Sequence, residues 1–140
     1  MERVIAVTRA LADSKRLRAL AVLFDHDGLC ACHIIALLDL APATVSRHMA
    51  LLVDAGLVSS WEKGRWVYYR LSDSLSPLMK QWLVQSWSRS TQAAVDRAVL
   101  EQILACDRTE LCACWRAGRR VAALGAVGIS DTGGSDGRTE

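Results

Sequence analysis

Residues 42–71 decide the fold, and they read PATVSRHMALLVDAGLVSSWEKGRWVYYRL. Pro42 suits the first turn of a helix, where its missing N–H leaves no hydrogen bond unmade. Apolar side chains then recur at the spacing of one helix face: Val45, Met49, Leu52 and Val53. This pattern predicts an amphipathic helix over 42–55, which Gly56 closes. Its other face carries small and polar side chains, which leave it slim enough to enter a groove.

Two segments with β character follow this helix. Valine, tryptophan and tyrosine gather in residues 57–62 and 66–71, and these residue types favour strands. Lys63-Gly64-Arg65 lies between the two segments and predicts the tip of a hairpin. The hairpin therefore ends in two basic side chains.

The chain before residue 42 predicts further helices. Helical spacing runs over 3–24, and Asp13 interrupts it at a point where it can cap a second helix. Gly28 suits the left-handed end of that helix, and a short helix is expected from about residue 30 to 38. A tight turn, 39–41, then leads into the helix over 42–55. Short helix, turn, helix and hairpin follow one another in the order of a winged helix-turn-helix.

The second half of the chain predicts one long helix and a tail. The helix is expected from Ser74 or Pro77 to Leu104. Six of the nine glycines fall at or after Gly118, which is the composition of a flexible tail. We therefore expect a mainly α fold with a small β-hairpin wing. We expect residues 1–105 to form the winged helix-turn-helix domain and residues 106–140 to form a cysteine-containing C-terminal extension.

Composition narrows the class of protein. The chain has 140 residues, of which 51% are hydrophobic, so it can bury a core. No apolar run reaches the roughly 18 residues of a membrane span, and we expect a cytoplasmic protein with reduced thiols and no membrane partner. Its formal net charge is +2, so DNA binding depends on where the charges lie. Neither a nucleophile-and-base set nor a pair of carboxylates is recognisable, and we predict that the protein is not an enzyme.

The predicted helix over 42–55 and the hairpin tip hold the candidate DNA-binding residues. Thr44, Ser46 and Arg47 lie on the outer helix face and can reach base edges or phosphates. His48 on the same helix supports packing or contacts DNA. Lys63 and Arg65 at the tip can hold the backbone or the minor groove. The expected partner is double-stranded operator DNA.

Cysteines occur in two similar boxes. Leu29-Cys30-Ala31-Cys32 is repeated as Leu111-Cys112-Ala113-Cys114, and Cys106 precedes the second box. Thiols grouped in this way favour capture of a soft ion, so these five cysteines are the candidate metal ligands. Residues two apart on an α-helix point about 200° apart. Cys30 and Cys32 are therefore expected to share an ion only if the first helical turn is distorted.

Residues 11–71 resemble the ArsR/SmtB family of metal-sensing repressors. Three stretches carry the resemblance: Leu11-Ala12-Asp13-Ser14-Lys15-Arg16-Leu17-Arg18, Thr44-Val45-Ser46-Arg47-His48-Met49-Ala50-Leu51-Leu52 with Ala55-Gly56-Leu57, and Lys63-Gly64-Arg65-Trp66-Val67-Tyr68-Tyr69-Arg70-Leu71. The resemblance implies a homodimer, packed through its first and last long helices, that represses a promoter until an inducer binds. One departure is Ala41, where these repressors often have a serine that caps the recognition helix.

The first box resembles the Glu-Leu-Cys-x-Cys-x-x-Cys motif of the arsenic branch of the family. Cys30 and Cys32 match its first two ligands, but Ile35 stands at the third. The resemblance implies trivalent arsenic or antimony as inducer and no permanent cofactor. Three ways to complete the site stay open. The C-terminal cluster of the same or the other subunit can supply the third thiolate; Cys106, Cys112 and Cys114 can form a site alone; or two thiolates can bind a methylated arsenical.

Two other interpretations of the thiols also stay open. Cadmium, lead or zinc can be the sensed metal, and for zinc the four cysteines in two C-x-C pairs suit a tetrahedral site. The thiols can instead sense oxidation. His26 and His33 lie near the first box and are expected at the surface.

Overall fold

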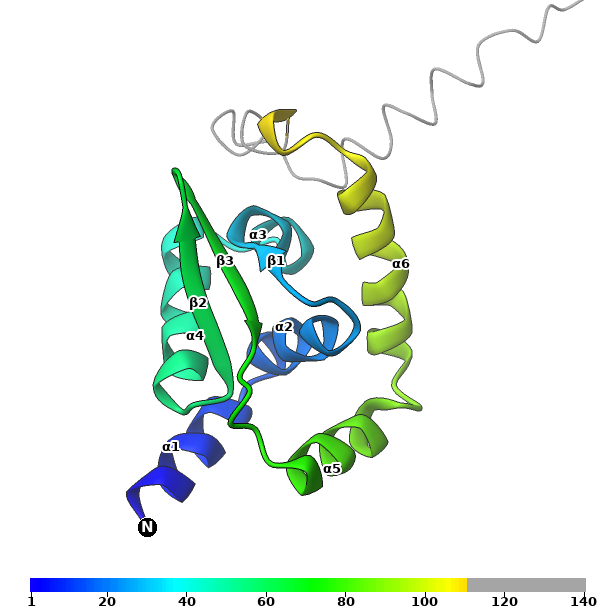
Figure 1. Ribbon diagram of the computed structural model, residues 1–140. Coiled ribbons are helices and arrows are strands. Elements are labelled where there is room, and N and C mark those ends of the chain that lie inside the picture. The colour runs from blue at the N-terminus through cyan, green and yellow to red at the C-terminus, as the bar shows by residue number, and fades with distance from the viewer. Residues whose placement is uncertain (111–140) are drawn as a thin grey trace, which may run out of the picture.

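The computed structural model describes residues 1–110. Its elements, in chain order, are α1 (Glu2–Leu11), α2 (Ser14–Asp25), β1 (Leu29–Cys30), α3 (Ala31–Leu38), α4 (Pro42–Asp54), β2 (Val58–Lys63), β3 (Trp66–Leu71), α5 (Pro77–Trp87) and α6 (Thr91–Ala105) (Figure 1). The predicted class, mainly helical with a small β wing, is confirmed. The predicted flexible tail, Cys112, Cys114 and most of the C-terminal extension lie outside the described residues.

The predicted interruption after the first helix is confirmed at Asp13. This residue is extended, and its carboxylate accepts hydrogen bonds from the backbone N–H groups of Lys15 (2.8 Å) and Arg16 (3.2 Å). These bonds satisfy two of the N–H groups that a helix leaves without partners at its start. The cap therefore sets where α2 begins.

The wing is a three-stranded antiparallel sheet in the order β1-β3-β2, with one strand more than the predicted hairpin. β2 and β3 pair from Val58↔Leu71 to Lys63↔Trp66, so the turn at the tip is Gly64-Arg65. Gly64 has a φ of 63°, which glycine adopts at little cost. Strand β1 is only two residues long, and it pairs Leu29 with Tyr69 and Cys30 with Tyr68.

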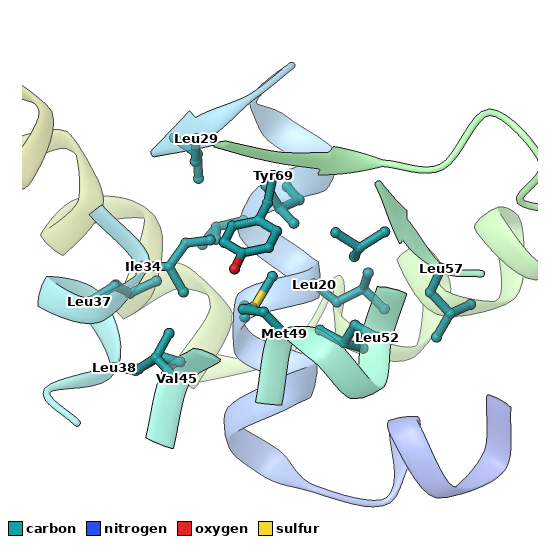
Figure 2. Packing of buried hydrophobic residues seen from close by; sticks show 14 of the residues in the cluster. Leu20, Leu29, Ile34, Leu37, Leu38, Val45, Met49, Leu52, Leu57 and Tyr69 are labelled. Carbon is teal, nitrogen blue, oxygen red and sulfur yellow. The ribbon is translucent and has the colours of Figure 1, made fainter. Parts of the chain in front are cut away.

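The core lies where the helices and the sheet meet. Val45, Met49 and Leu52 of α4 are buried as predicted, while Val53 is only partly buried. They pack with buried side chains from α2, α3 and the sheet, which Figure 2 shows around Met49: Leu20, Ile34, Leu38, Leu57 and Tyr69. Burying side chains of this size supplies about 1.5–3 kcal/mol each. This core fixes α3 and α4 against each other.

The single long helix predicted from residue 74 or 77 to 104 is wrong. The helix breaks at residues 88–90 into α5 and α6, which run in different directions (Figure 1). Ser90 is extended, and its hydroxyl accepts a hydrogen bond from the N–H of Ala93, so it caps a new helix. Helix α6 then packs against α2 and α3, where the Arg18 guanidinium holds both carboxylate oxygens of buried Asp96 at 2.9 Å.

None of the helices within residues 1–110 is by itself long and apolar enough to cross a membrane. By length and composition only, α3 and α4 pass that test as a pair, and the pair is bent by 111° at the turn between them. Both helices contribute to the core described above, which accounts for their apolar character.

Candidate functional site

Helix α4 presents the predicted DNA-binding residues on its outer face. Ser46 and Arg47 are exposed, and Thr44 is half-buried. Ala41 precedes α4 and offers no side-chain hydrogen bond to its first turn, as its sequence predicts, while Pro42 occupies the first helical position. The short polar side chains leave this face narrow, so it fits the geometry of a recognition helix in a major groove.

His48 of α4 is hydrogen-bonded to Arg16 of α2. The Arg16 Nη1 donates to His48 Nδ1 over 3.0 Å, and the same guanidinium donates to the carbonyls of Ala10 (2.8 Å) and Arg9 (3.0 Å). A guanidinium can only donate, so Nδ1 accepts and the ring proton of neutral His48 lies on Nε2. His48 therefore anchors α4 to the corner between α1 and α2.

The wing tip carries the predicted basic pair. Lys63 and Arg65 are both exposed, at the end of β2 and in the turn. Arg70, farther down β3, instead holds the Asp73 carboxylate at 2.8 and 2.9 Å. The tip is thus free to meet a polyanion, while Arg70 is engaged within the chain.

Stacked aromatic rings stiffen the middle of the β2–β3 hairpin. Trp61 of β2 stacks on Tyr68 of β3, with ring centroids 5.5 Å apart and planes 15° from parallel. Gly28, just before β1, has a φ of 103°, and a Cβ at that position would stand 3.1 Å from the Trp61 ring. Glycine is needed there for both reasons. This residue lies in the turn after α2 rather than at the predicted helix end, because His26 caps α2.

The first cysteine pair spans the start of α3. Cys30 precedes the helix with φ −67° and ψ 146°, and Cys32 is the second helical residue. Both thiols are buried. The predicted helix from about Cys30 begins one residue later, at Ala31, so the premise that both cysteines lie within one helix does not hold and Cys30 is extended. The Cys32 side chain already hydrogen-bonds to Cys30.

The surroundings of Cys30 favour its thiolate form. The hydrogen bond from the Cys32 side chain lowers the pKa of Cys30 to about 6, against the opposing effect of burial. A backbone hydrogen bond from Cys32 and the charge of Arg108 lower it further. Thiolate is the form that binds soft ions, so Cys30 is prepared for capture at neutral pH.

A cleft of about 400 Å³ lies between Cys30 and the end of α6. Cys30, His33 and Tyr68 line it from one side, and Cys106 and Arg108 line it from the other. Cys106 is half-buried and donates from its Sγ to the Gln102 carbonyl over 3.5 Å. Cysteines 76 positions apart in sequence therefore share one cleft.

The thiols of the described residues do not form a complete metal site in this structure. Among residues 1–110, no three His, Cys, Asp or Glu side chains are close enough to hold one ion as they stand. The structure thus brings Cys106 to the cleft of Cys30 without closing a three-ligand site. Cys112 and Cys114 lie outside the described residues.

His33 is more buried than its sequence position predicts. Its Nδ1 is buried and has no hydrogen-bond partner within the described part of the chain. Burial lowers the pKa of His33, and the nearby charges of Arg108 and His26 lower it further. The ring is therefore neutral at pH 7 and can donate or accept at the cleft.

Arg108 is a site residue that the sequence did not reveal. Its guanidinium donates to the Tyr68 hydroxyl and lies 5.6 Å from the Trp66 ring centroid and 5.8 Å from that of Tyr68. These are cation–π distances. Forty residues separate Arg108 from Tyr68, and no local motif marks the pair.

Comparison with other sequences identifies the family to which the chain is similar. Residues 13–60 match the family described as bacterial regulatory protein, arsR family. The arsenical resistance operon repressor of Escherichia coli K12 is 30% identical over 110 residues, covering 77% of this chain and 94% of that protein. ArsR1, an arsenic resistance regulator of Pseudomonas putida KT2440, is 38% identical over 77 residues, covering 55% and 57%. A cadmium resistance CadC homolog of Staphylococcus aureus is 34% identical over 70 residues, covering 50% and 58%.

Solved structures agree with this placement. HlyU from Vibrio cholerae has a TM-score of 0.55 and 26% identity, covering 64% of this chain and 92% of that chain. The antimony-specific repressor AntR has a TM-score of 0.52 and 25% identity, covering 65% and 79%. The chain belongs to the arsR family of bacterial regulatory proteins, which are DNA-binding transcriptional regulators and not enzymes.

Proposed function

We propose that this transcriptional repressor binds its operator as a homodimer and releases it when trivalent arsenic or antimony is captured by cysteine thiolates. The observation that carries the proposal is the cleft shared by Cys30 and Cys106, beside the buried Cys32. It lies between α3, which packs on the recognition helix α4, and β3 of the wing. The names of the arsenical relatives support the choice of inducer.

Arsenite suits this set of donors chemically. Each arsenic–sulfur bond forms as one hydroxyl leaves arsenite with the thiol proton as water, so three thiols release three waters and no electron is transferred. Trivalent arsenic is soft and prefers thiolates over oxygen ligands. Cys30, held as a thiolate beside Cys32, takes the first bond.

The third thiolate in this proposal is Cys106 of the same subunit. Ile35, at the position where the arsenic motif has its third cysteine, packs against the core and offers no ligand. Cys106 is the cysteine at the end of α6 that lines the cleft. Its Sγ has to leave the Gln102 carbonyl to reach an ion on Cys30 and Cys32. Capture therefore moves the end of α6.

We assign operator contacts to α4 and the wing. Thr44, Ser46, Arg47 and His48 contact the major groove or its phosphates, and Lys63 and Arg65 hold the backbone beside it. A homodimer presents two copies of this surface to a palindromic site.

The proposed dimer interface uses the terminal helices. Val4 and Ile5 of α1 are 62% and 49% exposed, and Val95 of α6 is 48% exposed. Exposed apolar side chains on both terminal helices favour burial of these helices against a second copy. We place the protein in the cytoplasm, where its thiols remain reduced.

A second candidate is a sensor of cadmium or zinc. Within residues 1–110 the Nδ1 of neutral His33 has no hydrogen-bond partner, and His33 lines the cleft with Cys30 and Cys106. These two sulfurs, the sulfur of Cys32 and one His33 nitrogen would suit a tetrahedral soft metal. The cadmium resistance relative supports it as well.

Release of fluorescent operator DNA separates these candidates. Purified, reduced protein is titrated with arsenite, methylarsenite, antimonite, cadmium and zinc, and anisotropy reports the bound fraction. Arsenite and antimonite are expected to release the wild type, whereas Cys30→Ser/Cys32→Ser stays bound. A Cys106→Ser variant that responds to methylarsenite but not to arsenite marks Cys106 as third ligand, and Cys112→Ser/Cys114→Ser is the matched control. Release by cadmium alone contradicts the arsenic assignment, and release by peroxide without metalloid indicates redox sensing.

A further inference from the structure

The segment that follows α6 touches the wing directly. Arg108 donates a hydrogen bond to the Tyr68 hydroxyl, and its guanidinium lies over the rings of Trp66 and Tyr68 at 5.6 and 5.8 Å. In Figure 1 this segment crosses the end of the molecule where α3 and the wing tip lie. One exposed side chain therefore joins the end of α6 to strand β3.

The wing strand that Arg108 contacts is also a wall of the thiol cleft. Tyr68 pairs with Cys30 across the β1–β3 ladder, and both residues line the cleft. Trp66 is the first residue of β3 and follows Arg65 of the tip directly. The contacts of Arg108 thus lie between the thiols and the basic end of the wing.

Closing the thiol site has to move the segment that carries Arg108. Within residues 1–110 the thiols are not close enough to one another to hold one ion, and Cys106 Sγ is hydrogen-bonded to the Gln102 carbonyl. Arg108 is two residues beyond Cys106. A displacement of Cys106 towards Cys30 is therefore transmitted to the guanidinium through a very short length of backbone.

We propose that Arg108 couples inducer capture to the wing: without inducer it holds Tyr68 and Trp66 in the DNA-binding position, and engagement of Cys106 withdraws it. This inference rests on the proposed function, because it takes Cys106 as the third ligand. Arg108 acts through β3 and is a positioning residue rather than a ligand. Arg108 makes this contact only in the inducer-free state, so it stabilises the DNA-binding conformation in that state alone. Allosteric coupling requires such a difference between two states.

The test compares R108Q with wild type in two separate measurements. Arsenite capture is followed by the ultraviolet absorbance of the arsenic–sulfur bonds, and operator affinity is measured by anisotropy with and without arsenite. R108Q is expected to capture arsenite with the wild-type stoichiometry. Its arsenite-free operator affinity falls roughly tenfold while its arsenite-bound affinity is unchanged, so the ratio of the two affinities shrinks by the same factor.

Two further variants make the result specific. R97Q removes an arginine on α6 whose partner is Asp25 of α2, and its affinity ratio is expected to stay at the wild-type value. Y68F removes the hydroxyl that Arg108 contacts and keeps the ring. If the coupling runs through this contact, the ratio of operator affinities without and with arsenite is no smaller in R108Q/Y68F than in R108Q alone.

The outcomes are distinguishable. If arsenite neither binds nor releases the wild type, the proposed function and this inference both fail. If arsenite releases the wild type and R108Q keeps the full affinity ratio, only the coupling role of Arg108 fails. An equal loss of affinity with and without arsenite also overturns it, since that result marks Arg108 as a plain DNA contact.

Discussion

Arg16 Nη1 and His48 Nδ1 lie 3.0 Å apart, which ties the recognition helix α4 to the start of α2. The Arg16 guanidinium also bridges two carbonyls at the end of α1. Three helices therefore share one mostly buried side chain. The orientation of α4, and with it the DNA-binding face, depends on this arginine.

Replacing Arg16 with methionine is expected to cost about 2 kcal/mol of unfolding free energy, since hydrogen bonds to a charged donor disappear and their acceptors stay unpaired. Urea denaturation measures this change. Operator affinity is expected to fall further than the unfolded fraction explains, because His48 is no longer anchored. R16K keeps the charge with fewer donors, so its unfolding free energy and its operator affinity should lie between those of wild type and the methionine variant. A methionine variant as stable as wild type would contradict the anchoring role.

Asp13→Ala removes the N-cap of α2 and is expected to cost about 1 kcal/mol at pH 7. Burial raises the pKa of Asp13, but hydrogen bonds from the N–H groups of Arg16 and Lys15 outweigh it, and the charge of Arg16 helps, so the pKa lies below its ordinary value. A lowered pKa stabilises the fold above the unfolded-state value and loses that effect as pH falls. The difference between wild type and D13A should therefore shrink below about pH 4.

The matched control for this prediction is Asp13→Ser, which caps without ionising. Its loss of stability at pH 7 should be smaller than that of D13A, and its difference from D13A should not vary with pH. Thermal melts at several pH values measure both. A D13A penalty that stays constant through the acid range argues against the charged cap.

Salt dependence separates the roles of α4 and the wing. K63Q/R65Q is expected to reduce the slope of log affinity against log salt by about one for each phosphate that is no longer neutralised. In a homodimer each substitution is present twice, so the reduction counts both subunits. Ser46→Ala is expected to weaken binding and reduce discrimination against a mutated operator, with the slope unchanged. Anisotropy over a range of potassium chloride concentrations measures both. Arg89→Gln, which alters an exposed arginine between α5 and α6, should change neither quantity.

The acidity of Cys30 can be read from thiolate absorbance. Because the Cys32 side chain lowers the pKa of Cys30 to about 6, the difference spectrum between wild type and Cys30→Ser should show thiolate appearing as pH rises through about 6. Cys32→Ala removes the donor and should move the midpoint upward. Cys32→Ser retains a hydroxyl donor and should keep the midpoint low. A wild-type midpoint above about pH 8, near that of an ordinary thiol, would exclude a pre-formed thiolate.

Much of the fold was predictable because its signals are local. Asp13 caps the helix that follows it, Pro42 begins α4, and Gly64 turns the wing, each through the conformation of one residue or its neighbours. Strand β1 was not predictable in the same way. Its two residues, Leu29 and Cys30, become a strand only because β3 lies beside them. The same pairing keeps Cys30 extended, so the helical geometry assumed for the thiol pair did not apply.

The candidate site was predictable only in part, for a related reason. The cysteines and the basic tip are conspicuous by residue type, so they were named from the sequence. Tyr68, His33 and Arg108 became site residues through packing between segments far apart in the chain. Nothing near Arg108 in sequence indicates an aromatic partner on the wing.

The break at residues 88–90 has a consequence for the position of Cys106. An uninterrupted helix over 77–105 would be about 43 Å long and would carry its last residue far from α3. The break instead turns α6 back along α2 and α3, which brings Cys106 to the cleft that Cys30 lines. Under the proposed function, a chain that lacks the third cysteine of α3 obtains its third ligand through the bend between its C-terminal helices. Three residues between α5 and α6, Ser88, Arg89 and Ser90, make that bend.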